Sequence, residues 1–221
     1  MFEKQSLIPK ARQIDTTVIA DARKGTTRVV APEIVCRSSN PVMFGFAYTV
    51  KADADILAGL HALGDLKEND VLVIDGGSLP IAYAGEIFAR DVERIGVAGI
   101  IVDGGHRDIP YIRTSSFPVF SRFAVPHAGP AKQTGESGIP VNIGGVTINP
   151  GDFIVSDANG IVVLDVDEAD AILDDAIAIK AAEAKVIAGM DSGKRLRELS
   201  NVEEHFAATE RGEESTFSWK V

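Results

Sequence analysis

The sequence is poor in the residues that build disulfide-bonded and zinc-dependent proteins. It contains one cysteine, Cys36, and four dispersed histidines in 221 residues. A single thiol excludes an intrachain disulfide framework and a zinc site built from cysteines. The histidines form neither an H-x-H pair nor an H-E-x-x-H motif. The chemistry of this protein is therefore expected to depend on other residue types.

Long apolar runs and an excess of basic charge are missing as well. The apolar runs are far shorter than the roughly 20 residues that cross a bilayer, and the first residues carry no apolar signal segment. The net charge is −10, with lysine and arginine scattered along the chain. Nucleic-acid binding depends largely on a basic face that neutralises phosphates. We therefore expect a cytoplasmic protein that binds neither membranes nor nucleic acid directly.

Three common catalytic signatures are also absent. The sequence contains no G-x-S-x-G elbow, no G-x-x-x-x-G-K-[ST] loop and no G-x-G-x-x-G fingerprint. Covalent serine chemistry and nucleotide binding through these loops have no support, and a nucleotide-dependent methyltransferase is disfavoured for the same reason.

The first half of the chain has the periodicity of alternating helices and strands. Apolar runs and helical spacing predict helices at Thr16–Lys24, Ala54–Leu63 and Gly85–Ile95, and strands at Phe44–Val50, Val71–Asp75 and Val97–Asp103. Asp15 is the predicted N-cap of the first helix, and Gly64 the predicted end of the second. The last strand–helix–strand succession predicts a parallel pair with a crossover helix.

The second half of the chain has short apolar runs separated by turn dipeptides. The predicted strands are Pro118–Val125, Val141–Ile143, Val146–Ile148, Phe153–Ser156 and Ile161–Leu164. This close spacing leaves no room for crossover helices and predicts an antiparallel or barrel-like half. A long helix is predicted from Asp167 to about Glu198. No repeat or long linker divides the chain, so residues 1–221 are predicted to form one domain, with an extension over about 199–221.

Two turns carry the most informative residues of the sequence. The first strand of the parallel pair leads to Gly85–Glu86 at a helix start, the second leads to Arg107–Asp108, and twenty residues separate Glu86 from Arg107. We expect these groups to meet at one edge of the sheet. Helix N-terminal amides bind anions, arginine grips carboxylates, and Mg²⁺ needs only one or two protein carboxylates. The pattern therefore predicts a site for a small anion and a divalent cation.

A plainer interpretation of the same residues remains open. Gly104–Gly105 would form a tight turn, and Arg107 and Asp108 would form a surface ion pair. Asp75 and Asp103, which end the two strands, would then either cap turns or reach the site.

Several motifs stand in an order that covers most of the chain. They are TTVIADA at Thr16–Ala22, GFAYTVK at Gly45–Lys51, Gly85–Glu86 with Arg107–Asp108, PVF at Pro118–Phe120, and the segment from Gly151 to Val163. In this combination the chain resembles the RraA-like family. That family includes the regulator of ribonuclease E activity and the 4-hydroxy-4-methyl-2-oxoglutarate (HMG)/4-carboxy-4-hydroxy-2-oxoadipate aldolases. Many members were once labelled demethylmenaquinone methyltransferases.

The resemblance implies a fold and an assembly. The fold would be α/β, a swivelling β/β/α domain with a central mixed sheet or barrel-like β core, flanking helices and a long C-terminal helix. The assembly would be a homotrimer or a dimer of trimers with sites near the subunit interfaces.

The resemblance also implies roles for individual residues. The pyruvoyl end of a small 2-oxo acid substrate would be bound by the amides around Gly85, Glu86, Ile87 and Phe88. Arg107 would hold the carboxylate or keto oxygen and stabilise an enolate. Asp108 would coordinate Mg²⁺ or Mn²⁺, largely through waters, and Glu86 would orient a water molecule near the reaction centre.

Two functions follow from this resemblance. The first is a metal-dependent aldolase that cleaves a 2-oxo-4-hydroxy acid such as HMG to release pyruvate, with oxaloacetate decarboxylation as a side activity. The alternative is a non-catalytic protein that binds and inhibits an RNA-processing ribonuclease. The aldolase pattern has an acid three residues after Asp108, where this chain has Tyr111, and His106 replaces a usually apolar residue. The exact substrate is therefore left open.

Overall fold

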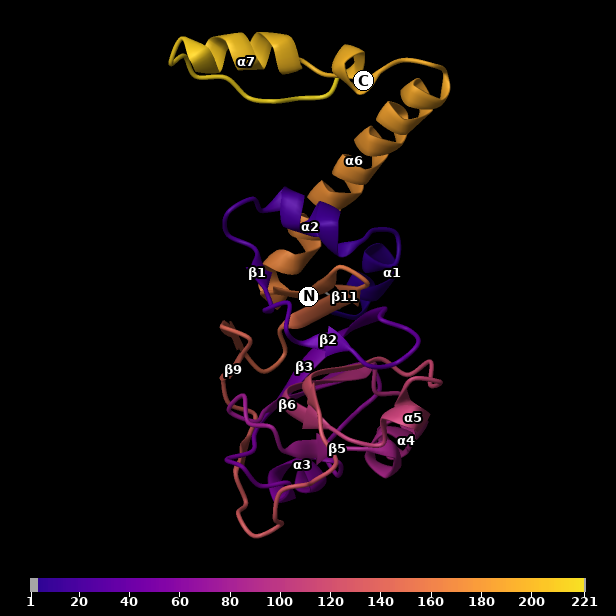
Figure 1. Ribbon diagram of the computed structural model, residues 1–221, viewed down its shortest axis with the longest axis vertical. Helices are drawn as coiled ribbons and strands as arrows, with labels where there is room; N and C mark the ends of the chain where they lie inside the picture. The colour runs from indigo at the N-terminus through magenta and orange to yellow at the C-terminus, as the bar shows by residue number, and fades with distance from the viewer. Residues whose placement is uncertain (1–3, 221) are drawn as a thin grey trace.

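A computed structural model describes residues 4–220 and contains one large mixed sheet with helices on its outer faces (Figure 1). The sheet has the order β1-β12-β11-β3-β4-β6-β7-β2, with β5 beside β6 and β8 beside β3, and it curls into a half barrel. A separate hairpin consists of β9 and β10. The strands are β1 Arg28–Val29, β2 Val35–Cys36, β3 Met43–Lys51, β4 Asp70–Asp75, β5 Ala82–Ala84, β6 Gly99–His106, β7 Val119–Ala124, β8 Glu136–Ser137, β9 Val141–Ile143, β10 Val146–Ile148, β11 Phe153–Asp157 and β12 Gly160–Leu164.

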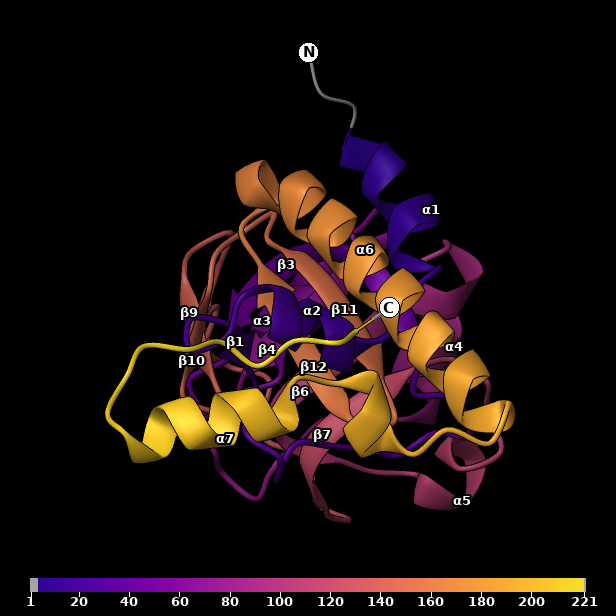
Figure 2. The same cartoon turned by 90° about the horizontal axis from the view of Figure 1, so that it is seen from above.

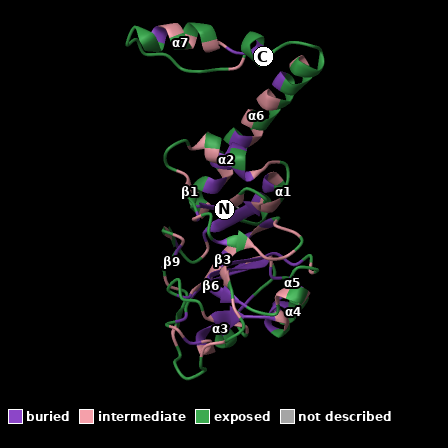
Figure 3. Ribbon diagram, viewed as in Figure 1, coloured by how far each residue is buried: buried purple, intermediate pink, exposed green. Residues whose placement is uncertain are grey.

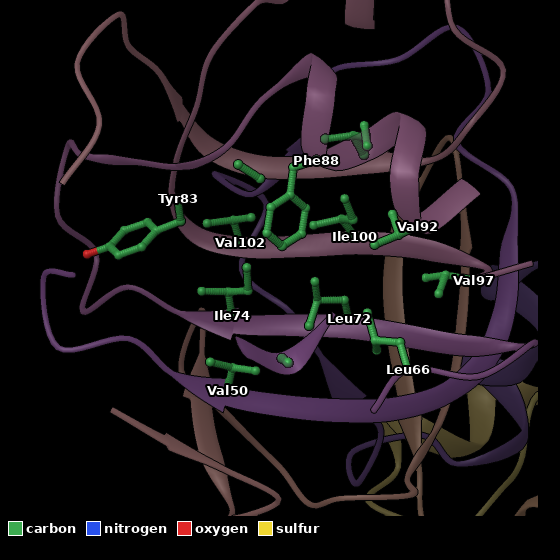
Figure 4. Close-up of a cluster of buried hydrophobic side chains, with 14 of the residues drawn as sticks. Val50, Leu66, Leu72, Ile74, Tyr83, Phe88, Val92, Val97, Ile100 and Val102 are labelled. Atoms are coloured by element: carbon green, nitrogen blue, oxygen red, sulfur yellow. The ribbon is translucent and has the colours of Figure 1, made fainter. Parts of the chain in front are cut away.

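The helices cover the sheet in two groups. They are α1 Leu7–Ala11, α2 Thr16–Ala22, α3 Leu57–Ala62, α4 Glu86–Arg94, α5 Ile109–Ile112, α6 Val166–Asp191 and α7 Val202–Glu210, with short 3-10 turns at Lys4–Ser6 and Leu196–Leu199. Helices α3 and α4 pack on β3, β4 and β6, where Phe88 of α4 contacts the core around Leu72 and Ile100 (Figure 4). Helices α1, α2 and α6 pack on β11 and β12, and α6 runs diagonally over the sheet when seen from above (Figure 2).

The predicted strand–helix–strand unit is confirmed. Strands β4 and β6 are parallel neighbours in a register that pairs Asp75 with Asp103, and α4 is the crossover between them. The carboxyl ends of the two strands therefore lie at one edge of the sheet, as expected. The N-cap of α2 is also confirmed, because the Asp15 side chain accepts a hydrogen bond from the amide of Val18 at 3.2 Å.

Strand β7 corrects the prediction for the second half of the chain. The hairpins β9–β10 and β11–β12 are antiparallel as predicted, but β7 lies parallel to β6. The crossover between β6 and β7 contains only α5, a helix of four residues. For β7 the antiparallel alternative was wrong, because it assumed that a parallel connection needs a long helix, whereas the barrel-like alternative agrees with the curled sheet.

Two helix boundaries also differ from the predictions. Helix α3 begins at Leu57 rather than Ala54, because Asp53 and Ala54 have positive φ values of 44° and 62° that a helix does not accommodate. Helix α6 ends at Asp191 rather than near Glu198, and the left-handed Gly193 (φ 96°) follows it. Beyond this point the chain forms the 3-10 turn Leu196–Leu199 and α7, which extend away from the sheet and are mostly exposed (Figures 1 and 3).

Candidate functional site

The predicted site residues meet where β6 ends beside the start of α4. Gly85 is the N-cap of α4, and Asp108, two residues beyond β6, takes the left-handed conformation with φ 60°. The amide of Glu86 donates to Asp108 Oδ2 at 2.9 Å, and Arg107 Nε lies 3.7 Å from the same oxygen. The ion pair of the plainer interpretation is therefore present, but its tight turn is not, because Gly104 and Gly105 lie inside β6.

The helix start offers amides that no helical carbonyl can satisfy. The first intrahelical bond described for α4 runs from the amide of Ala89 to the carbonyl of Gly85, so the preceding amides of the first turn point out of the helix. The carboxylate of Asp108 accepts a hydrogen bond from the amide of Glu86. The amides of Ile87 and Phe88 are available to an anion at the positive end of the helix dipole, as the predicted substrate-binding role requires.

Gly85 is required by the close approach of the two elements rather than by its backbone angle. Its φ of −158° is ordinary extended backbone. A Cβ atom at this position would lie 2.4 Å from Asp108 Oδ2 and 2.9 Å from Arg107 Cγ. Any side chain here would therefore displace both predicted functional groups.

The replacement Gly85→Ala is expected to lower kcat/KM for the expected 2-oxo acid substrate by about 100-fold, because a displacement of about 1 Å at a reactive group has effects of that size. The protein is expected to stay folded. The added methyl meets side-chain atoms and leaves the backbone unstrained. Steady-state kinetics and thermal unfolding of the variant measure the two effects separately. Wild-type kcat/KM in a folded variant would contradict this account.

A cavity of about 730 Å³ opens beside these residues. It is lined by Gly85, Ile87, Phe88, Arg107 and Asp108 of the predicted site, and also by Ile56, Leu60, Arg90, Arg94 and Tyr111. Ile87 is largely exposed at its edge, whereas the Phe88 side chain is buried in the core. The cavity therefore combines an apolar wall with several charged groups.

Glu86 is not among the residues that line this cavity, but its carboxylate contacts Arg90, which is. Arg90 Nε donates to Glu86 Oε1 at 2.9 Å, one helical turn along α4. The guanidinium of Arg90 also stacks on the ring of Tyr111, 4.3 Å from its centre. Sequence reasoning missed Arg90, although its four-residue spacing from Glu86 was a usable signal.

His106 is fully buried at the end of β6, immediately before the site residues. Its Nδ1 lies 2.8 Å from the carbonyl oxygen of Arg107, and its Nε2 has no hydrogen-bond partner in the described part of the chain. Burial lowers the pKa of His106 to about 4, against the opposing effect of the hydrogen bond to Arg107. A neutral imidazole with its proton on Nδ1 therefore supports the Arg107 carbonyl.

The buried imidazole predicts a loss of stability in acid. The pKa of His106 in the folded protein lies below the ordinary value of 6.5. Folding with a neutral imidazole therefore costs nothing above pH 6.5, and the free energy of unfolding falls as the pH drops from 6.5 toward 4. Between pH 7.5 and 4.5 this loss amounts to about 2–3 kcal/mol of the free energy of unfolding. Urea unfolding of His106→Leu at both pH values should show a smaller pH dependence by that amount. An unchanged pH dependence would contradict the assignment, and His61→Gln, at an exposed position of α3, is the control.

The two aspartates that end the parallel strands do not reach the cavity. Asp103 is buried and accepts hydrogen bonds from Arg122, Ser78 and the amide of Gly144. Asp75 accepts from the amides of Gly77 and Asn142. Both stabilise loops, and neither lines the cavity.

The oxygen donors at the site fit a hard divalent cation that keeps most of its waters. The described contacts of Asp108 use Oδ2, and its side chain is 41% exposed. No cluster of three or more histidine, cysteine, aspartate or glutamate side chains that could enclose a metal occurs within residues 4–220. A single carboxylate suits Mg²⁺ or Mn²⁺ but not a structural zinc ion.

Comparisons with known proteins show which proteins this chain is similar to. Residues 16–163 match the family model for RraA-like proteins, described as Aldolase/RraA. A protein of Halalkalibacterium halodurans named "Putative 4-hydroxy-4-methyl-2-oxoglutarate aldolase" is 38% identical over 159 residues, which cover 71% of this chain and 75% of that protein. None of the helices within residues 4–220 has the length and apolarity needed to span a membrane.

Two solved structures have a similar fold. An uncharacterized protein from Pseudomonas syringae pv. tomato superposes with a TM-score of 0.79 at 25% identity, over 88% of this chain and 96% of that one. The RNA-processing inhibitor RraA from Thermus thermophilus superposes with a TM-score of 0.63 at 25% identity, over 67% and 91% of the two chains.

Proposed function

Because this chain belongs to the RraA-like family, we propose that it is a divalent-metal-dependent lyase. It cleaves a 2-oxo-4-hydroxy acid such as HMG and releases pyruvate. The observation that carries this proposal is the convergence of Arg107, Asp108 and the first-turn amides of α4 on one cavity. The aldolase name of the Halalkalibacterium relative supports the same reaction class.

The residues of the site match the charges that develop during cleavage of the C3–C4 bond. The amides of Ile87 and Phe88 and the guanidinium of Arg107 bind the carboxylate next to the 2-oxo group. As the bond breaks, its electron pair moves toward the 2-oxo oxygen, and Arg107 stabilises the resulting negative charge. A Mg²⁺ or Mn²⁺ ion at Asp108 would polarise the same oxygen.

Proton transfer completes the reaction. The proton of the 4-hydroxyl group leaves to a water molecule that Glu86 orients, and C4 becomes the carbonyl carbon of the departing fragment. C3 then takes a proton, which gives pyruvate. Loss of CO₂ from oxaloacetate needs the same stabilisation of an enolate, so we expect this side activity. No lysine lies in the motif, which disfavours a Schiff-base route.

The test is the release of pyruvate from HMG by the purified protein with added Mg²⁺ or Mn²⁺. Pyruvate is measured in an assay coupled to lactate dehydrogenase. Removal of divalent ions with a chelator should abolish the activity, and their return should restore it. Full activity in the chelator would contradict the role of the metal. Size-exclusion chromatography with light scattering tests the expected homotrimer or dimer of trimers.

A non-catalytic role is the second candidate. The Thermus structure at 25% identity is named an RNA-processing inhibitor, and the net charge of −10 suits a basic partner. Binding to an RNA-processing ribonuclease, together with no cleavage of any 2-oxo acid in the presence of metal, would favour this role.

A further inference from the structure

The guanidinium of Arg90 is a second cationic group in the cavity that contains Arg107 and Asp108. It lies 4.3 Å from the centre of the Tyr111 ring and contacts Glu86 at 2.9 Å. The mechanism above uses Arg107 for the carboxylate next to the 2-oxo group. It leaves Arg90 without a function.

Arg90 and Tyr111 lie at matching places on two helices that begin side by side. The hydrogen bond from the amide of Glu86 to Asp108 joins the starts of α4 and α5. Arg90 and Tyr111 follow these two residues by about one helical turn, or roughly 5–6 Å. Side chains on a helix lean toward its N-terminus, so both lean back toward the anion site. Arg90 is therefore within about one helical turn of the anion site, a separation that a short dicarboxylic acid can span.

The donors of Arg90 are available to a ligand. Its contacts with Glu86 use Nε and Nη2 on a single carboxylate oxygen, and its side chain is 58% exposed. An exposed pair of this kind is weak, so a ligand carboxylate can compete with Glu86. The centre of the Tyr111 ring lies 4.3 Å from Arg90 Cζ. Nη1 takes part in neither contact with Glu86, so Nη1 and Nη2 can together form a bidentate contact with a ligand carboxylate.

Tyr111 gains a function from the same geometry. The aldolase motif has an acid at this position, and a carboxylate facing Arg90 would pair with it and neutralise it. The ring of Tyr111 instead contacts the guanidinium without adding a second negative charge to that of Glu86.

We propose that Arg90, oriented by Tyr111, binds a second carboxylate on the carbon that carries the 4-hydroxyl group of the substrate. The inference rests on the proposed function, because it names the part of the substrate that leaves as the second fragment. It assigns to Arg90 and Tyr111 the discrimination between HMG, which carries this carboxylate, and a substrate that carries an uncharged group in its place.

The experiment compares two substrates that differ only in this carboxylate. HMG yields two molecules of pyruvate, whereas 4-hydroxy-4-methyl-2-oxopentanoate, with a methyl group in its place, yields pyruvate and acetone. Arg90→Gln is expected to lower the ratio of kcat/KM for HMG to that for the second substrate by about 10- to 100-fold, mainly through KM for HMG. Tyr111→Leu should lower the ratio about 2- to 5-fold, and Tyr111→Phe, which keeps the ring, should retain it.

The control is Arg12→Gln, which removes an arginine from another aromatic ring, that of Phe44, outside the cavity. The proposal would be overturned if this ratio of kcat/KM values in Arg90→Gln stayed within threefold of the wild-type ratio. It would also be overturned if Arg94→Gln changed the ratio more than Arg90→Gln does. Binding separates this inference from the proposed function. Calorimetry with 2-oxoglutarate and 2-oxopentanoate should show the same loss of discrimination in Arg90→Gln even if the wild-type protein cleaves neither substrate.

Discussion

Replacement of Asp108 by alanine is expected to lower kcat/KM for HMG cleavage by about 10³-fold, because one carboxylate has two tasks at this site. It is the proposed ligand of the divalent ion, and its Oδ2 accepts the amide hydrogen of Glu86 at 2.9 Å. Loss of a group that stabilises developing negative charge reduces rates by about 10²–10³-fold, and loss of the metal adds to this effect. Steady-state kinetics over a titration of Mg²⁺ or Mn²⁺ measures the change.

Asp108→Asn separates these two tasks. The asparagine side chain keeps an acceptor for the Glu86 amide, so the start of α4 should retain its stability, whereas Asp108→Ala should lose about 1 kcal/mol of the free energy of unfolding. Both variants lack the negative charge that the metal requires, and both should lose activity. Wild-type activity in Asp108→Asn would show that Asp108 acts as a helix cap and not as the metal ligand.

The part of the site that could be predicted from the sequence consists of backbone features and residues adjacent in the chain. Gly85 begins a helix at the edge of a parallel pair, and Arg107 and Asp108 follow the neighbouring strand. The topology of a strand–helix–strand unit brings these positions together without any knowledge of side-chain packing. The family resemblance is confirmed by the family model, which matches residues 16–163.

Side-chain contacts across elements could not be predicted in this way. The family resemblance implies that Glu86 lies near the reaction centre, but it does not predict that its carboxylate contacts Arg90. The guanidinium of Arg90 in turn lies over the ring of Tyr111, in a helix with only four residues. That helix was not predicted, because four residues are too few to show a helical period. The same short element allows β7 to lie parallel to β6, so one missed helix accounts for both the strand direction and the partner of Arg90.

The burial of Asp103 likewise depends on contacts between distant segments. Its carboxylate accepts from Arg122 Nε at 2.6 Å and Nη2 at 3.2 Å, from Ser78 Oγ at 2.9 Å and from the amide of Gly144 at 2.7 Å. These partners come from three separate parts of the chain. Burial raises the pKa of Asp103, but the hydrogen bonds from Arg122, Gly144 and Ser78 outweigh it and hold the pKa below its usual value.

Asp103→Ala is therefore expected to lower the free energy of unfolding by about 3–5 kcal/mol, because it leaves the largely buried guanidinium of Arg122 without a partner. Urea unfolding at neutral pH measures the loss, and Glu213→Ala, which breaks the exposed pair with Arg211, is the matched control. The double replacement Asp103→Leu/Arg122→Leu removes both charges and should recover much of the stability lost in Asp103→Ala. If Asp103→Ala unfolds at the same urea concentration as the control, the contacts of Asp103 with Arg122 and Gly144 do not stabilise the fold. Activity follows only indirectly from this contact, since Asp103 does not line the cavity.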